Sequence, residues 1–183
     1  MKAILVHGTY GFPENNWFPW LKNELQKIGY EVIIPKFPTP QEQNLAQWMQ
    51  VLEPHFKEFD EQTILIGHSL GCAFLLSVLE KLEKPVKAVF LVAGFIKQLG
   101  NPKFDPINKT FLQKNFDFKK IKDNSEYFFV YGSENDEYVP TEQVLRLAKS
   151  LETSVISIPE AGHFMSKSFS QLLSDVEEIE KKI

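Results

Sequence analysis

The chain has 183 residues, which is enough for one sizeable hydrophobic core, so we expect a single domain over residues 1–183. Hydrophobic residues make up 43% of the sequence and charged residues 24%, as in an ordinary globular protein. The formal net charge of −4 argues against nucleic acid as a partner, because a surface that binds phosphates is usually basic.

In chain order, the first apolar run covers residues 2–6 and stops at His7-Gly8. It is too short for the core of a signal peptide or for a membrane span. We therefore expect a cytoplasmic protein that has no membrane partner. The single cysteine, Cys72, excludes an internal disulfide, and we expect it to pack in the core.

Six apolar, strand-like runs alternate with five segments in which apolar residues recur every three or four positions. The strand-like runs cover residues 2–6, 30–34, 63–66, 87–92, 127–131 and 154–158. The helical segments cover residues 17–28, 45–59, 70–82, 141–151 and 169–179. This alternation predicts an α/β fold, in which a doubly wound, mostly parallel six-stranded sheet forms three layers with helices on both faces.

Residues 95–124 interrupt the alternation, because they are too long for a simple link between a strand and a helix. They contain two short apolar pieces, residues 107–111 and 116–121. One interpretation is a small cap of one or two helices that lies across the carboxyl ends of the strands and shields a pocket. The other is a surface excursion without such a role, and composition favours neither.

Residues 67–71 read Gly-His-Ser-Leu-Gly and lie between a strand-like run and a helical segment. This is the G-x-S-x-G pattern in the strand, turn and helix context of a nucleophile elbow. Glycines on both sides allow two stretches of backbone to approach closely at the turn that lifts the serine above the sheet. The pattern predicts Ser69 as a nucleophile, and the alternative is a glycine-rich turn whose serine has no special function.

A serine hydroxyl attacks a carbonyl only if a base accepts its proton, and the chain has four histidines. His7 ends the first strand, His55 lies in a predicted helix, and His68 precedes the serine with its side chain expected to point away. His163 follows the last predicted strand, in a loop at the carboxyl edge of the sheet, where a base can reach Ser69. We therefore predict His163 as the base, against the alternative of a loop histidine without a role.

The acid that orients this histidine should also follow a strand, and residues 127–131 lead into a loop that contains Glu134 and Asp136. Asp136 is the stronger candidate because the next predicted helix begins soon after it and ties the loop at both ends. Its carboxylate would hold His163 in the required tautomer. The alternatives are that Asp136 caps that helix or faces solvent, with Glu134 as the acid. The chain order Ser69, Asp136, His163 is that of hydrolases built on this type of sheet.

Acyl transfer also needs hydrogen-bond donors for the oxyanion of the tetrahedral intermediate, usually two backbone amides. The amide of Leu70, directly after the serine, is one candidate for the oxyanion hole. The second is expected from the loop after the first strand, where we prefer Thr9 to Tyr10. That loop lacks the lysine of a P-loop and the glycine spacing of a dinucleotide site, which disfavours phosphate binding.

Several aromatic residues fall close to these positions and could line a modest pocket for an acyl group. The candidates for the substrate pocket are Tyr10, Trp17, Phe95 and Phe164. Because the chain has 16 phenylalanines, any single aromatic residue is weak evidence for a pocket, and packing in the core is the more common role.

A set of motifs spans nearly the whole chain, namely His7-Gly8, Trp17-Phe18-Pro19-Trp20, Phe37-Pro38-Thr39-Pro40, the elbow, the Asp136 loop and Ala161-Gly162-His163-Phe164. With this set the chain resembles the small α/β hydrolases grouped with the retinoblastoma-binding serine hydrolase and its bacterial relatives. The resemblance implies a compact α/β-hydrolase fold with strand order 2-1-3-4-5-6 and a triad of Ser69, Asp136 and His163. It also implies hydrolysis of small esters or amides without a metal or another cofactor. Some relatives carry a glycine run after the first strand, whereas this chain has Gly8 and Gly11 there, which leaves the second oxyanion donor open.

Two hypotheses of different classes follow. The first is a serine hydrolase that acts on a small-molecule acyl substrate through an acyl-enzyme intermediate, as a carboxylesterase or, alternatively, a thioesterase or peptidase. The second is a hydrolase fold that serves as a binding module for a protein or a small ligand, because fold alone does not determine function. The first requires the imidazole of His163 to lie on the same side of the molecule as the hydroxyl of Ser69.

Overall fold

The computed structural model describes residues 1–181, and the strands in this part of the chain form one parallel sheet. The strands are β1 (Lys2–Val6), β2 (Glu31–Ile33), β3 (Thr63–His68), β4 (Val86–Val92), β5 (Ser125–Gly132) and β6 (Val155–Ser157). Their order across the sheet is β2-β1-β3-β4-β5-β6, with each neighbouring pair parallel. This confirms the predicted fold class and the strand order that the family resemblance implied.

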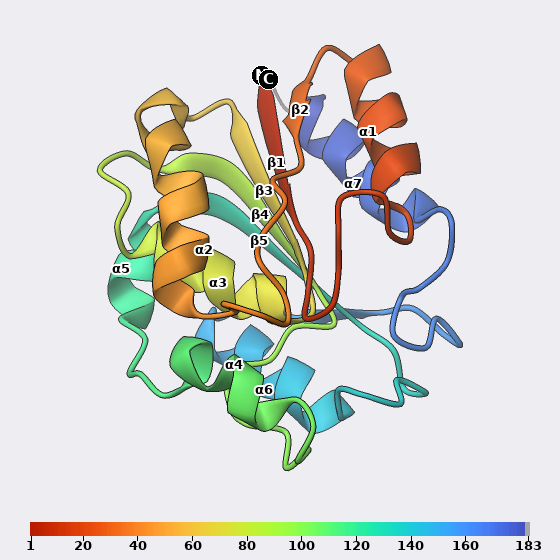
Figure 1. Ribbon diagram of the computed structural model, residues 1–183. Helices are drawn as coiled ribbons and strands as arrows, with labels where there is room; N and C mark the ends of the chain where they lie inside the picture. Colours follow the sequence, from red (N-terminus) through yellow and green to blue (C-terminus); the bar gives the residue numbers. More distant parts are fainter. Residues whose placement is uncertain (182–183) are drawn as a thin grey trace.

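Helices cover both faces of the sheet, as Figure 1 shows. They are α1 (Phe18–Lys27), α2 (Leu45–Leu52), α3 (Leu70–Leu79), α4 (Asp105–Leu112), α5 (Phe118–Asp123), α6 (Thr141–Ser150) and α7 (Ser170–Glu180). The apolar side chains of α1 and α7 form a core cluster with one face of the sheet, and those of α2, α3 and α6 form a second cluster with the other face. Strands β3 and β4 are buried along their whole length, which explains their nearly continuous apolar sequences.

The segment predicted as one helix over residues 45–59 divides in two. The α-helix α2 ends at Leu52, and a 3-10 helix, η1 (Glu53–Glu58), continues the chain. Pro54 lies in the first turn of η1, and because proline has no backbone N–H it cannot continue the hydrogen-bond ladder of α2. The spacing of the apolar residues continues from α2 into η1, so the sequence pattern did not reveal where the α-helix ends.

The long segment 95–124 combines the two interpretations that the sequence left open. Helix α5 packs on α3 and β5 with Ile121 fully buried, as an ordinary crossover helix between β4 and β5. Helix α4 and the turn before it lie at the carboxyl edge of the sheet, where Phe104 and Asn108 border a pocket. The first half of the segment therefore shapes the pocket, and the second half belongs to the helical layer.

The carboxyl ends of the strands meet at the lower edge of the sheet in Figure 1. From β1 the chain continues to β2 on one side, and from β3 it continues to β4 on the other, so the loops after β1 and β3 diverge. Such a switch point leaves a crevice in which α/β proteins bind ligands. The register pairs Val6 with Gly67, which brings the loop after β1 beside Ser69. None of the helices in residues 1–181 combines the length and apolar character needed to cross a bilayer.

Candidate active site

Ser69 occupies the turn between β3 and α3, with a φ of 55° and a ψ of −121°. Residues other than glycine rarely adopt this region, so the backbone is strained at the serine. The turn is also tight because strand β1 lies directly beside it. A Cβ atom on Gly71 would lie 2.4 Å from the carbonyl oxygen of Val6, so only glycine allows α3 to begin this close to β1. The strand, turn and helix of a nucleophile elbow are thus present around Ser69.

The loop after β1 contacts the serine directly. A Cβ atom on Gly8 would lie 2.8 Å from Ser69 Cβ and 3.3 Å from Ser69 Oγ, so a side chain there would occupy the space around the hydroxyl. His7 holds this loop in place. Its Nδ1 lies 2.9 Å from the Gly8 carbonyl oxygen and its Nε2 accepts a hydrogen bond from the Phe37 amide at 3.2 Å. Nδ1 therefore carries the proton, and burial lowers the pKa of His7, which keeps the ring neutral.

Asp136 and His163 form a close pair, although 27 positions separate them in the sequence. Nδ1 of His163 lies 2.9 Å from Oδ2 and 3.1 Å from Oδ1 of Asp136, and the Asp136 side chain is only 2% exposed. The amides of Tyr138 and Val139 donate to Oδ1 and hold the carboxylate in place. Because a carboxylate can only accept, His163 Nδ1 carries the proton and Nε2 is left free to accept one. Glu134, the alternative acid, is exposed.

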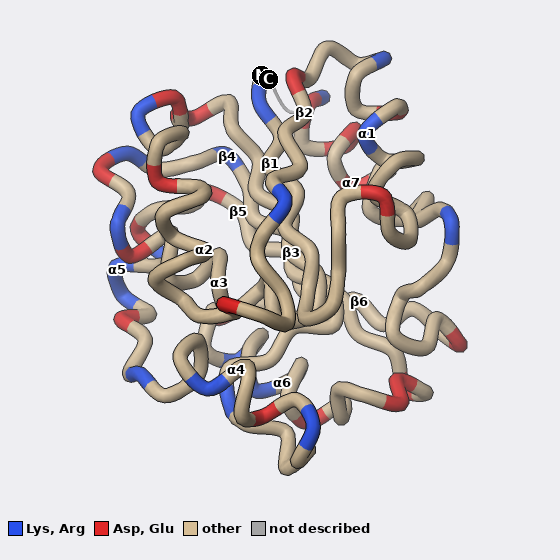
Figure 2. Tube along the Cα trace, viewed as in Figure 1, with Lys and Arg blue, Asp and Glu red and all other residues tan. Residues whose placement is uncertain are grey.

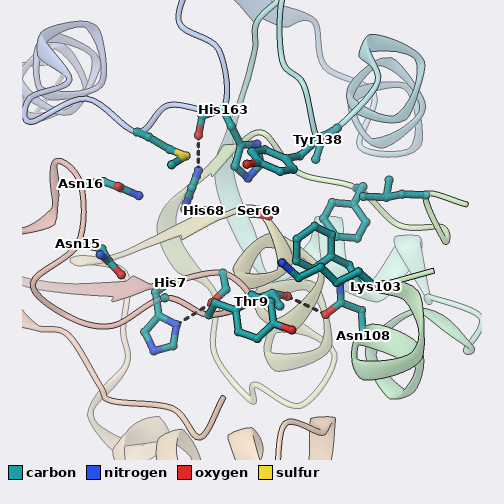
Figure 3. Close-up of a pocket in the computed structure, with 18 of the residues that line it drawn as sticks. His7, Thr9, Asn15, Asn16, His68, Ser69, Lys103, Asn108, Tyr138 and His163 are labelled. Carbon is teal, nitrogen blue, oxygen red and sulfur yellow. Dashed lines mark hydrogen bonds between the residues drawn. The ribbon is translucent and has the colours of Figure 1, made fainter. Parts of the chain in front are cut away.

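Ser69 and His163 line the same pocket, which has a volume of about 320 Å³. Figure 3 shows Ser69 between His163 and Tyr138 on one side and Thr9, Lys103 and Asn108 on the other. Within residues 1–181, Ser69 Oγ and the His163 ring do not form a hydrogen bond. Contacts of this kind often close only when a substrate is bound. The three residues that the sequence selected thus lie at one edge of the sheet, with the pair of Asp136 and His163 already formed.

Two buried side chains anchor the loop that carries His163, and sequence reasoning missed both roles. His68 Nε2 lies 2.8 Å from the carbonyl oxygen of His163, and Trp17 Nε1 donates to that of Phe164 at 3.0 Å. The His68 side chain, which we expected to point away from the nucleophile, lies against the loop of the proposed base, with its ring centroid 4.8 Å from that of His163. Two backbone amides of the loop also donate hydrogen bonds. The Ala161 amide donates to Ser133 Oγ at 3.1 Å, and the Gly162 amide donates to Asn135 Oδ1 at 2.8 Å.

His68 must be neutral to fill this position. Burial, together with the nearby imidazole of His163, lowers the pKa of His68 to about 3. In the unfolded chain the same group has a pKa of about 6.5. Between these two values the unfolded state binds a proton that the folded state does not, so the free energy of unfolding decreases as the pH falls from about 6.5 towards 3.

Two substitutions of His68 separate anchoring from titration. His68→Gln keeps a donor for the His163 carbonyl, so we expect near-normal ester turnover. Because glutamine does not titrate, the free energy of unfolding should fall between pH 7 and pH 5 by about 2 kcal/mol less in this variant than in the wild type. His68→Leu leaves that carbonyl without its donor, so we expect it to cost about 1–3 kcal/mol at pH 7 and to lower kcat. Urea unfolding at both pH values and turnover of a short ester measure these effects. An unchanged pH dependence in His68→Gln would contradict the assignment.

Two backbone amides near Ser69 are the candidates for an oxyanion hole. Leu70 is the first residue of α3, and an amide at that position has no partner within the helix. In the loop after β1, the Tyr10 amide donates to Thr39 Oγ1 at 2.9 Å and is therefore occupied. Of the two candidates in that loop this leaves Thr9, which lines the same pocket as Ser69. This arrangement favours Thr9 over Tyr10.

A buried polar cluster holds Thr9 in place from outside the loop. Thr9 Oγ1 donates to Asn108 Oδ1 of α4 at 2.7 Å, and Gln43 Nε2 donates to the same oxygen at 2.7 Å. The Thr39 hydroxyl in turn donates a hydrogen bond to Gln43 Oε1. Asn108 is 2% exposed, so its polar atoms depend on these partners. The position of the loop after β1 is thus coupled to α4, a connection between residues 99 positions apart that no local pattern indicates.

The predicted pocket residues divide into two groups. Tyr10 and Phe95 line the pocket that contains Ser69. Trp17 and Phe164 do not, because both are buried in the core cluster between the sheet and the helices α1 and α7. Their contribution to the site is the hydrogen bond that anchors the His163 loop. Their aromatic character therefore reflects core packing, the alternative interpretation.

Cys72 is fully buried, and burial raises the pKa of its thiol, so it is a core residue and not a nucleophile. Within residues 1–181 no cluster of three or more His, Cys, Asp or Glu side chains is arranged to hold a metal ion.

The sequence is similar to known proteins over nearly its full length. The profile of the serine hydrolase family matches residues 3–178. The protein YdeN of Bacillus subtilis (strain 168) is 32% identical over 166 residues, which make up 90% of this chain and 86% of YdeN. Serine hydrolase RBBP9 of Rattus norvegicus is 26% identical over 175 residues, which make up 94% of this chain and 91% of RBBP9.

Solved structures show the same similarity. The crystal structure of the ydeN gene product from B. subtilis matches with a TM-score of 0.92 and 28% identity, covering 98% of both chains. Est1E from Butyrivibrio proteoclasticus, solved with bound ferulic acid, matches with a TM-score of 0.76 over 99% of this chain and 88% of Est1E. At 15% identity the second match shows only a common fold.

Proposed function

The chain belongs to the serine hydrolase family, and from this premise we propose that it hydrolyses small esters or amides with Ser69 as the nucleophile. The observation that carries the proposal is the close pair of Asp136 and His163, whose histidine lines the same pocket as Ser69. Such a pair leaves His163 Nε2 ready to accept a proton from an alcohol. The size of the pocket, about 320 Å³, supports a small substrate.

In the proposed mechanism, Ser69 Oγ attacks the carbonyl carbon while its proton passes to His163 Nε2. The negative charge on the carbonyl oxygen is stabilised by the amides of Leu70 and Thr9. Collapse of this intermediate breaks the bond to the leaving group, which takes the proton from His163, and an acyl-enzyme remains. Water then attacks the acyl carbon and gives a proton to His163. As the bond from the acyl carbon to Ser69 Oγ breaks, His163 returns that proton to Oγ, and the carboxylic acid is released. Asp136 stabilises the imidazolium formed in each half of the reaction.

A fluorophosphonate probe tests the nucleophile directly, because it reacts only with an activated serine. We expect one covalent label per chain, which mass spectrometry of peptides places on Ser69. The variant Ser69→Ala should not be labelled. Ser168→Ala, which changes an exposed serine in the loop before α7, should be labelled at the wild-type rate. A label on another serine, or none at all, would remove Ser69 from the mechanism.

The same experiment addresses the alternative function as a binding module, since an unused site should neither react with the probe nor turn over an ester. The feature that favours this alternative is the lack of a direct hydrogen bond between Ser69 and His163 within the described residues. A panel of esters, thioesters and amides, measured together with labelling, decides between the two functions. It also identifies the class of acyl bond that the enzyme cleaves.

A further inference from the structure

Among the side chains that line the pocket of Ser69, the formal charge is positive. Among its described lining residues there is one lysine, Lys103, and no arginine, aspartate or glutamate. The chain as a whole is acidic, with a net charge of −4, and carries residues of both signs on its helices and outer loops (Figure 2). Within residues 1–181, Lys103 Nζ takes part in no ion pair. Its charge is therefore available to a ligand.

The position of Lys103 is defined by its surroundings. It lies in the turn before α4, where its amide donates to Asn101 Oδ1 at 2.9 Å. Its Nζ lies 5.5 Å from the ring centroid of Tyr10 and 5.3 Å from that of Phe104. These distances are in the range of cation–π interactions, which favour a side chain laid across the rings over one extended into solvent. Figure 3 shows the Lys103 side chain reaching over the pocket on the side of Thr9.

An aromatic wall connects Lys103 to the proposed catalytic base. The Phe104 ring packs edge-on against Tyr138, with centroids 6.0 Å apart, and Tyr138 packs edge-on against His163 at 5.1 Å. A small molecule with its carbonyl at Ser69 and its chain along this wall would place its far end near the Lys103 ammonium. The pocket therefore has a reacting end, an apolar side and a cationic end.

We propose that Lys103 binds a carboxylate of the substrate, so that the preferred substrates are small esters or amides that carry one negative charge. This inference rests on the proposed function of Ser69 and adds the chemical class of the substrate. A single ammonium matches a carboxylate better than a phosphate, which usually requires several donors. Lys103 is exposed, so salt should weaken the interaction.

Matched substrate pairs test the proposal without changing molecular size. The first pair places the charge on the acyl side and comprises the 4-nitrophenyl monoester of glutaric acid and its primary amide, 4-nitrophenyl glutaramate. The second places it on the leaving group and comprises 3-acetoxybenzoate and 3-acetoxybenzamide. We expect the wild type to prefer the charged member of at least one pair by about tenfold in kcat/KM at low ionic strength. The preference should decrease in 0.5 M NaCl, an ionic strength of about 0.5 M, at which exposed charges are strongly screened.

Two lysine variants provide the comparison. Lys103→Met should reduce the ratio of kcat/KM between the charged and the neutral member of each pair to about one, because the charged member then has no ammonium to bind. Lys109→Met makes the same change of net charge on the exposed side of α4 and should retain the wild-type preference.

The outcomes separate the two proposals. If the wild type hydrolyses charged and neutral members equally, or if the preference survives in Lys103→Met, the assignment of Lys103 is wrong while the hydrolase function stands. If none of the four esters is hydrolysed and Ser69 is not labelled by the fluorophosphonate, both the function and the role of Lys103 are overturned.

Discussion

Replacement of Ser69 by alanine is expected to lower kcat/KM for 4-nitrophenyl acetate by about 10⁴-fold or more, the scale seen when a nucleophilic serine is removed from other hydrolases. The loss follows because alanine has no atom that can form the acyl-enzyme, while the proposed oxyanion donors, the amides of Leu70 and Thr9, are unchanged. Release of 4-nitrophenol measured for wild type and variant gives the ratio. The residual rate reports what binding and the oxyanion donors contribute without the nucleophile.

The fold should survive this change. Ser69 Oγ is not part of the hydrogen-bond pattern that holds the elbow, which uses the Ser69 amide to the Val92 carbonyl at 2.8 Å. Urea unfolding of Ser69→Ala should therefore agree with the wild type to about 1 kcal/mol. Turnover above one tenth of the wild-type value in a folded variant would show that another residue carries the reaction.

Asp136→Asn is expected to lower kcat by about 10³–10⁴-fold with little effect on stability. The asparagine Oδ1 can still accept the amides of Tyr138 and Val139, so the loop keeps its shape. The asparagine Nδ2 replaces Oδ2, the oxygen that faces His163 Nδ1. Because an amide NH₂ group can only donate, His163 Nδ1 must then accept the hydrogen bond. The proton then lies on Nε2, the atom that should accept the proton of Ser69. The variant thus fails through the wrong tautomer of the histidine.

The neighbouring acid provides the matched control. Glu134→Gln makes the same loss of one negative charge in the same loop, two positions away and on an exposed side chain. It should change kcat by less than about twofold, as expected for a surface charge outside the site. If Glu134→Gln and Asp136→Asn reduced kcat equally, the effect of Asp136 would be a general effect of charge and the tautomer argument would be wrong.

Most of the fold could be predicted because its signals are local. Strands β3 and β4 are buried on both faces and therefore read as continuous apolar runs, while α6 shows the three- and four-residue spacing of a half-buried helix. The ends of the elements were predicted less accurately. The helix predicted over residues 45–59 stops at Leu52, because Pro54 interrupts its hydrogen bonds. The positions of α4 and α5 were both anticipated, but not their different roles.

The catalytic candidates were found by a combination of local and topological reasoning. Ser69 is marked by a local pattern, because glycines must flank this tight turn: a Cβ on Gly71 would lie 2.4 Å from the carbonyl oxygen of Val6 in β1. Asp136 and His163 carry no such pattern. They could be proposed because parallel strands end at one edge of the sheet, so that loops distant in sequence meet there. The structure brings these two side chains within hydrogen-bond distance.

The amino-acid sequence by itself determined the α/β architecture, the elbow and the edge of the sheet at which chemistry could occur, because these depend on periodicity, on glycine and on strand direction. Only the tertiary structure decided how side chains from different elements meet. It assigned Trp17 to the core, gave His68 a partner 95 positions away, and placed Lys103 above the pocket. The reason is physical: a hydrogen bond or a ring contact depends on positions to within an ångström, and those positions follow from packing of the whole chain and not from neighbours in sequence.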